Sequence, residues 1–176
     1  MPTSRPRRPA IERPAARTAG AARRRAARDA KPSLSLSIQL GEGVDELPAT
    51  RARLRRWVAA AIDADATLAL RFVSEREARA LNAQYRHRDY VPNVLTFPYH
   101  AAGEHIEADI VICAPVVGRE ARAQRKEYGD HLAHLVIHGV LHACGHDHQH
   151  AGDAARMQAL ETAVLARFGI GDPWRR

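Results

Sequence analysis

The sequence contains few cysteines and no long apolar run. Its 176 residues include two cysteines, Cys113 and Cys144, which cannot build a disulfide framework and form no Cys-x-x-Cys pair. No uninterrupted apolar stretch approaches the roughly 20 residues that span a bilayer, and the N-terminus lacks the apolar core of a secretory signal. These absences argue against a disulfide-stapled secreted module and a membrane-spanning protein, and they favour a reducing, cytoplasmic setting.

Acidic residues are nearly missing from the start of the chain. Residues 1–31 hold ten lysines and arginines and two acidic residues, whereas the remaining 145 residues hold 17 basic and 18 acidic ones. The net charge of +7 and the sequence pI of 10.2 therefore come from this segment. The rest of the chain is close to neutral, so the high pI does not by itself indicate a basic nucleic-acid-binding domain.

The same segment lacks large aliphatic side chains, because Ile11 is the only one after Met1. An Arg/Ala/Pro-rich stretch of this kind cannot bury enough apolar surface to offset the entropy of ordering, so we expect residues 1–31 to be a disordered extension. Its arginine clusters, which include Arg23, Arg24 and Arg25, could contact nucleic-acid phosphates. A solvated tail, a stretch upstream of the true start codon and an organellar transit peptide are the alternatives.

Hydrophobic periodicity predicts a mixture of strands and helices from Ser33 onward. Strict alternation from Ser33 to Leu40 is typical of a half-buried strand, and Ser74-Glu-Arg-Glu77 is a capping box that opens a helix. Further strands are expected at 67–73, 93–97 and 108–113. Helices are expected at 46–62, 74–85, 115–128 and 152–168, and one more helix is expected to begin at Asp130 as its N-cap. Because strands and helices do not alternate strictly, the pattern favours an α+β fold in a single domain, 32–170, followed by a C-terminal tail, 171–176.

The histidines are concentrated in one region that can bind a metal. His138 and His142 lie four residues apart and therefore on one face of a helix. Gly145 ends that helix and more histidines follow, so three imidazoles can surround one ion, as in a catalytic zinc site. Spacing alone does not decide the third ligand, for which the candidates are His146, His148 and His150. Two earlier histidines on the same stripe are more simply read as structural or solvated: His131 and His134.

The general base of the zinc peptidases is absent from this helix. Those enzymes use His-Glu-x-x-His, in which the glutamate accepts a proton, but Gly139 follows His138 here. The nearest acid is Asp147. It is expected either to orient a ligand histidine from behind or to accept a proton from metal-bound water.

Three blocks together resemble a known family. The run His138-Gly-Val-Leu-His142-Ala-Cys-Gly-His-Asp147-His148 is similar to the signature of the YbeY family of ribosomal RNA maturation endoribonucleases. The blocks from Leu81 to Pro98, with Asn-Val-Leu-Thr-Phe-Pro at its end, and from Asp109 to Cys113 also match that family. The resemblance covers about residues 33–168.

The resemblance implies a small mixed sheet of about four strands packed with about five helices. It also implies one zinc ion on His138, His142 and His148, with Arg86 at the family's functionally important arginine. Without it, an ion pair of Arg86 with Asp89 is the simpler expectation. The implied activity is single-strand-specific, zinc-dependent RNA cleavage in maturation of the small-subunit rRNA 3′ end and in ribosome quality control.

The implied partners are rRNA, the small ribosomal subunit and ribosomal proteins; the sequence does not set the oligomeric state. Two other functions compete with catalysis on RNA. One is a non-catalytic, metal-binding ribosome-assembly factor, and the other is a metallopeptidase, which the missing glutamate disfavours.

Overall fold

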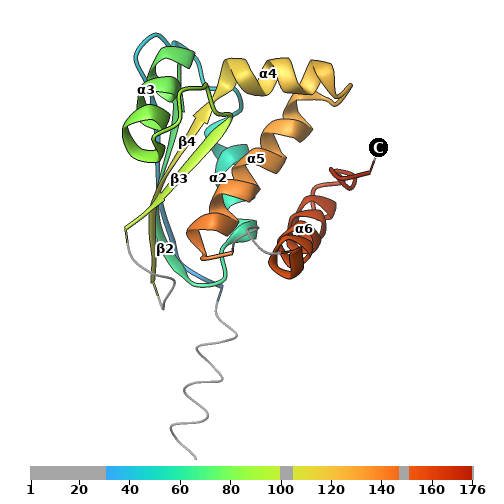
Figure 1. The fold of residues 1–176 in the computed structure, drawn as a ribbon. Helices are drawn as coiled ribbons and strands as arrows, with labels where there is room; N and C mark the ends of the chain where they lie inside the picture. The colour runs from blue at the N-terminus through green and yellow to red at the C-terminus, as the bar shows by residue number, and fades with distance from the viewer. Residues whose placement is uncertain (1–30, 100–104, 147–150, 176) are drawn as a thin grey trace, which may run out of the picture. The chain divides into compact units, whose positions relative to one another are not determined.

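The computed structural model describes residues 31–99, 105–146 and 151–175 (Figure 1). The predicted tail arginines, Arg23 to Arg25, lie outside the described residues. So do Asp147 and two candidate ligands, His148 and His150. From Pro32 onward the chain makes one compact unit.

Four strands form one mixed sheet: β1 (Leu34–Leu40), β2 (Asp65–Val73), β3 (Val94–Pro98) and β4 (His105–Cys113). Their order is β1-β2-β4-β3. Strands β1, β2 and β4 run parallel to one another, and β3 runs antiparallel to β4. The predicted mixed sheet of about four strands is therefore confirmed within the described residues.

Alternation along the strands decides which face of the sheet is apolar. Leu68 and Leu70 of β2 are level with Ala108 and Ile110 of β4, and all four are buried. Serines alternate with the apolar residues of β1, as a strand with one solvated face requires. The apolar face carries the main core.

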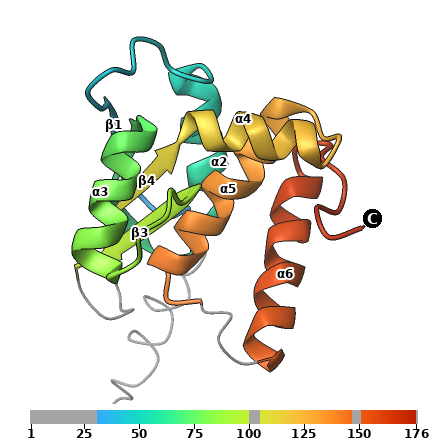
Figure 2. The ribbon, with the colours of Figure 1, turned by 45° about the horizontal axis from the view of Figure 1, so that its top comes forward.

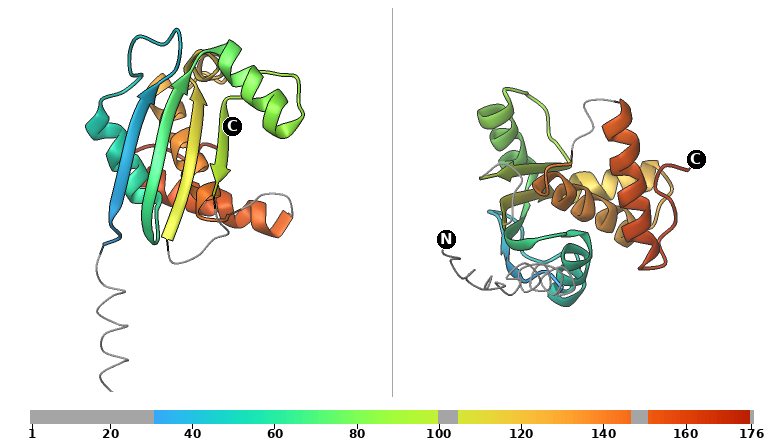
Figure 3. Two further views of the ribbon diagram at one scale, coloured as in Figure 1. Left: turned by 90° about the vertical axis from the view of Figure 1, so that its left-hand side faces the viewer. Right: turned by 90° about the horizontal axis from the view of Figure 1, so that it is seen from below.

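Five described helices surround the sheet, which confirms the predicted α+β class: α2 (Arg51–Ala61), α3 (Glu75–Arg86), α4 (Ala114–Ala123), α5 (Tyr128–Ala143) and α6 (Ala151–Ala166). Helices α2 and α5 pack on the apolar face, where Leu54, Trp57, Val136 and Val140 join the main core. Helix α3 covers part of the opposite face through a smaller core, and Figure 3 shows α2 and α3 on opposite sides of the sheet. No described helix is long and apolar enough to cross a membrane.

Helix α5 lies between the sheet edge and α6, so both can place side chains beside it (Figure 2). Its last turn ends at Gly145, whose φ of 88° is favourable for glycine alone. The His146 amide donates to the Leu141 carbonyl, which turns the chain back over the end of the helix. The predicted break at Gly145 is confirmed.

Three predicted helix boundaries are wrong. Helix α2 begins at Arg51 rather than residue 46, because the Thr50 hydroxyl accepts from the Arg53 amide and caps it there. Helix α4 ends at Ala123 rather than residue 128. Helix α5 begins at Tyr128, and Asp130 lies in its first turn instead of at the N-cap. In the first turn, the negative charge of Asp130 still interacts favourably with the helix dipole.

Candidate metal centre and groove

The histidine stripe of α5 divides into a buried half and a half that faces a cavity. His131 and His134 are buried, whereas His138 and His142 are partly exposed. The ring centroids of His138 and His142 are 4.6 Å apart, closer than the 6.3 Å between His134 and His138. The two histidines predicted as metal ligands from this helix therefore adjoin each other at its C-terminal end.

A cavity of about 530 Å³ brings these two histidines together with Arg86. Its walls come from the end of α3, the segment before β3, strand β3 itself and the end of α5; they are formed by Arg86, Tyr90, Asn93, Val94, Thr96, Pro98, His138, His142, Gly145 and His146. A second hollow of about 730 Å³ shares Arg86, Tyr90, Asn93 and Val94 and extends the first along the end of α3. The two make one groove, with Arg86 beside both parts.

Gly139 allows β3 and β4 to approach the ligand helix closely. A Cβ atom at this position would lie 2.7 Å from Ile110 Cγ2 and 3.3 Å from Thr96 Oγ1. The buried Thr96 hydroxyl donates to the Gly139 carbonyl at 3.1 Å. The Thr96 carbonyl in turn accepts from Arg86 at 3.4 Å. One threonine therefore connects Arg86 to the helix that carries His138 and His142.

The alternative interpretation of Arg86, an ion pair with Asp89, is wrong. Asp89 instead accepts two hydrogen bonds from Arg79, at 2.6 and 3.0 Å. Arg79 stands two helical turns before Arg86 on α3, so the carboxylate is drawn away from the groove. His87 adopts a left-handed conformation with φ 54°, ends α3 and leaves Arg86 as its last residue.

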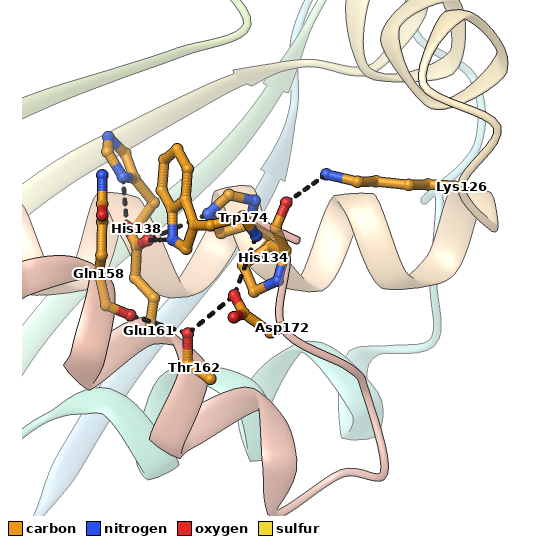
Figure 4. Close-up of polar contacts among 9 residues, drawn as sticks. Lys126, His134, His138, Gln158, Glu161, Thr162, Asp172 and Trp174 are labelled. Atoms are coloured by element: carbon orange, nitrogen blue, oxygen red, sulfur yellow. Dashed lines mark hydrogen bonds and ion pairs between the residues drawn. The ribbon is translucent and has the colours of Figure 1, made fainter. Parts of the chain in front are cut away.

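A buried carboxylate from α6 lies behind the histidines (Figure 4). Glu161, 1% exposed, accepts at 2.6 Å from Nδ1 of His138 and at 3.2 Å from Nε2 of His134. The indole N–H of Trp174 donates to the same carboxylate at 3.0 Å. Burial raises the pKa of Glu161, but the hydrogen bonds to His134 and His138 outweigh it and bring the pKa to about 2. The side chain is therefore charged at neutral pH.

His134, His138 and Glu161 offer three ligand atoms within 4.8 Å of one another, so they form a possible metal site of their own. The carboxylate, however, already accepts three hydrogen bonds. A metal held there would have to displace at least the two imidazole protons. A carboxylate that accepts from Nδ1 of a histidine is also the usual partner behind a metal-ligating imidazole, which then binds through Nε2.

A second polar network fixes the N-terminal half of the stripe. Nε2 of His131 contacts Glu120 of α4 at 2.8 Å, and Glu120 accepts from the Asn93 amide at 3.0 and 3.1 Å. Within the described residues, Nδ1 of His131 and Nδ1 of His134 are buried and make no hydrogen bond. These two histidines connect α5 to α4 and α6, and Glu120 connects α4 to the segment before β3.

Sequence patterns did not identify Glu161 or Trp174. Residues 171–176 remain predicted as a C-terminal tail. Within it, the Pro173 carbonyl accepts from Lys126 at 2.8 Å and Asp172 accepts from the Trp174 amide. Glu161 lies in α6, where no recognisable motif surrounds it. Its 23-residue separation from His138 leaves no local signal for the contact.

Known proteins resemble this chain over most of its length. The family model described as "Endoribonuclease YbeY" matches residues 45–169. Endoribonuclease YbeY of Thiobacillus denitrificans is 54% identical over 144 residues, which cover 81% of this chain and 97% of that protein. Endoribonuclease YbeY of Bordetella pertussis is 53% identical over 152 residues, covering 80% and 96%. That of Methylibium petroleiphilum is 45% identical over 147 residues, covering 84% and 98%.

Proposed function

Because the chain belongs to the endoribonuclease YbeY family, of hydrolases that act on RNA, we propose that it cleaves single-stranded RNA in maturation of the small-subunit rRNA 3′ end and in ribosome quality control. The observation that carries the proposal is the cavity that Arg86 shares with His138 and His142. An arginine fork matches the geometry of a phosphodiester. The paired imidazoles supply nitrogen ligands for a metal beside it.

One zinc ion is proposed on His138, His142 and His148. The donor set fits zinc, which takes three imidazoles and keeps a fourth position open in catalytic sites. Glu161 supports this set, because its contact with Nδ1 of His138 directs the other ring nitrogen to the metal. When bound, zinc would supply Lewis acidity and lower the pKa of a coordinated water.

Each protein residue has a separate role in this proposal. Arg86 holds a nonbridging phosphate oxygen and stabilises charge that develops on the phosphoryl group. Thr96 fixes the distance between Arg86 and the ligand helix through its two hydrogen bonds. Asp147, outside the described residues, is proposed to orient a ligand histidine or to accept a proton from the attacking oxygen.

The test compares Arg86→Gln with Arg76→Gln, an exposed arginine of the same helix that pairs with Glu42. Arg86→Gln should lower the cleavage rate of a labelled single-stranded RNA about 100-fold or more, as loss of a charge-stabilising donor does. Its zinc content and Tm should match the wild type. Arg76→Gln should cleave normally. Unchanged cleavage by Arg86→Gln would contradict the role of the groove.

The same assays separate the competing functions. His142→Ala should lose both zinc and RNA cleavage. Cleavage of casein but not of RNA would indicate a metallopeptidase. Normal ribosome association and normal rRNA 3′ ends in a strain that carries His142→Ala would indicate a non-catalytic assembly factor.

The proposed partners are rRNA, the small ribosomal subunit and ribosomal proteins in the cytoplasm. Residues 32–170 are proposed as the catalytic domain and residues 1–31 as a basic extension that adds RNA affinity through Arg23, Arg24 and Arg25. Removing residues 1–31 should therefore flatten the dependence of RNA binding on salt. An unchanged slope would show that the extension does not contact RNA.

A further inference from the structure

Helix α2 concentrates positive charge where a helix does not favour it. Its first six residues include Arg51, Arg53, Arg55 and Arg56, and its first turn contains no acidic residue. The N-terminal end of a helix already carries partial positive charge, so cations there are unfavourable. The arginines of α2 therefore require an explanation other than helix stability.

Two of the four arginines protect the edge of the sheet. Arg51 donates to the Ile38 carbonyl at 3.0 Å, and Arg55 donates to the Leu34 carbonyl at 2.8 Å. Both acceptors belong to β1, which is an edge strand and would otherwise present unpaired carbonyls. Arg53 and Arg56 make no such contact with β1.

Arg53 and Arg56 line a separate cavity of about 530 Å³ together with Arg167, which follows α6. The guanidinium of Arg53 lies 4.9 Å from the ring centroid of Trp57, and that of Arg56 lies 5.7 Å from the ring centroid of Phe168. These stacked positions orient both guanidinium groups without neutralising them. The cavity is therefore a built feature rather than a chance cluster of flexible side chains.

The three guanidinium groups have no carboxylate partner in the described part of the chain. The arginine ion pairs found there belong to other residues: Arg71, Arg76, Arg79, Arg119 and Arg156. Asp130 is the one acidic residue that lines the cavity, so the formal charge around it is +2. This local excess contrasts with the nearly neutral charge of residues 32–176 as a whole.

We propose that the cavity of Arg53, Arg56 and Arg167 is a second RNA contact, which binds backbone phosphates away from the metal centre. Trp57 is 1% exposed and the guanidinium of Arg56 lies over the partly buried ring of Phe168. The exposed groups of the cavity are therefore mainly guanidinium groups, and phosphate is the part of RNA that they match. Asp130 and His142 stand at opposite ends of α5, roughly 18 Å apart along the helix axis. Because backbone phosphates carry no base identity, this contact holds an RNA strand independently of its sequence. The proposal of this contact rests on the proposed action on RNA.

The test measures how the binding of a fluorescein-labelled single-stranded RNA depends on salt, by fluorescence anisotropy of the full chain. In Arg53→Gln/Arg56→Gln the slope of log K against log salt should fall by about 1.4, because each single-strand phosphate contact contributes about 0.7. Arg53→Lys/Arg56→Lys keeps the charge and should keep the slope. Arg76→Gln/Arg79→Gln, two exposed arginines on α3, removes the same charge elsewhere and should leave it unchanged.

Arg167→Gln gives a second arm from another element, in case the double variant does not fold by circular dichroism. Arg167 also donates to the Ala60 carbonyl of α2 at 3.1 Å, so the Tm of this variant is measured beside its slope. Its slope should fall by about 0.7. An unchanged slope in Arg167→Gln or in a folded double glutamine variant, or an equal fall in the α3 control, overturns the proposal. Displacement of a labelled acidic peptide instead of RNA would also overturn it. Wild-type protein that binds RNA through these arginines but never cleaves it would contradict the proposed function and leave this contact standing.

Discussion

Replacing Glu161 by glutamine should destabilise the protein although the two side chains have nearly the same shape. The carboxylate accepts hydrogen bonds from His134, His138 and Trp174. A glutamine amide provides one acceptor oxygen, and its NH₂ group would face at least one of these donors. A buried donor would then be left without an acceptor, which is costly in an environment that excludes water.

The size of the effect follows from the charged state of the carboxylate. Its pKa falls from 4.5 to about 2, so folding stabilises the charged form relative to the neutral form by about 3 kcal/mol. This net value already includes the burial penalty on the charge. We expect Glu161→Gln to lower the free energy of unfolding by about 2–4 kcal/mol, within the usual range for one broken partner in a buried charged network.

Urea unfolding at pH 7 measures this difference, with a chelator present so that metal release does not contribute. Glu42→Gln is the matched control, because the Glu42 side chain is 82% exposed and its change should lie within about 0.5 kcal/mol. Trp174→Phe removes the indole donor and part of the ring that packs against His134, and it should cost about 1 kcal/mol or slightly more. A loss below 0.5 kcal/mol in Glu161→Gln would refute the reasoning.

Zinc affinity gives a second reading of the same variant. If Glu161 sets the ring orientation of His138, Glu161→Gln should bind zinc about 10- to 100-fold more weakly in a chelator competition. If Glu161 were itself a ligand, with His134 and His138, then His134→Ala should weaken zinc binding as strongly as His142→Ala. Equal losses in those two alanine variants would favour the alternative ligand set.

Three further predictions rest on local geometry and on pKa values. The pKa of Glu161 is lower in the folded than in the unfolded protein, so the charged carboxylate stabilises the fold fully above about pH 4.5 and loses this effect towards pH 2. Between these two pH values, the free energy of unfolding of the metal-free wild type should fall more steeply than that of Glu161→Gln. Urea unfolding at a series of pH values measures both. Gly139→Ala places a Cβ 2.7 Å from Ile110 Cγ2 and should cost about 1–3 kcal/mol of unfolding free energy, whereas Gly152→Ala, with open space around it, should cost little. Burial raises the pKa of Cys144 to about 12, so a thiol reagent at pH 8 should modify it far more slowly in folded than in urea-unfolded protein; equal rates would contradict this.

The fold was predictable where one physical constraint dominates a segment. Alternation from Ser33 to Leu40 identified β1 because one face of that strand is buried and the other is solvated. Ser74 was correctly predicted as the N-cap of α3, since its hydroxyl accepts from the Glu77 amide. The Glu77 side chain, however, pairs with Arg71 of β2 instead of completing the box. Tertiary contacts therefore redirected a side chain that local sequence rules had assigned.

The candidate site was predictable only where its residues lie close together in the chain. His138 and His142 follow from helical spacing, and the place of Arg86 came from a resemblance rather than from any pattern around it. Predicting the role of Glu161 would have required knowing that α6 packs beside α5. A long-range contact between two helices leaves no periodic signal in the sequence of either helix. The predicted first residues of α2 and α5 were wrong because several residues near the start of each helix can serve as its N-cap.

Thr96 is the residue that joins the parts of this site. Its carbonyl accepts a hydrogen bond from Arg86, and its hydroxyl donates one to the Gly139 carbonyl. Arg86 and the ligand helix are therefore both bound to the same residue of β3. That arrangement needs glycine at the position where zinc peptidases carry their general base, because a Cβ there would clash with Ile110 of β4 and crowd Thr96 of β3. The packing of β3 and β4 against the ligand helix therefore excludes a side chain at the position of the peptidase glutamate, and the hydrogen bond from Arg86 to Thr96 places an arginine beside the same helix.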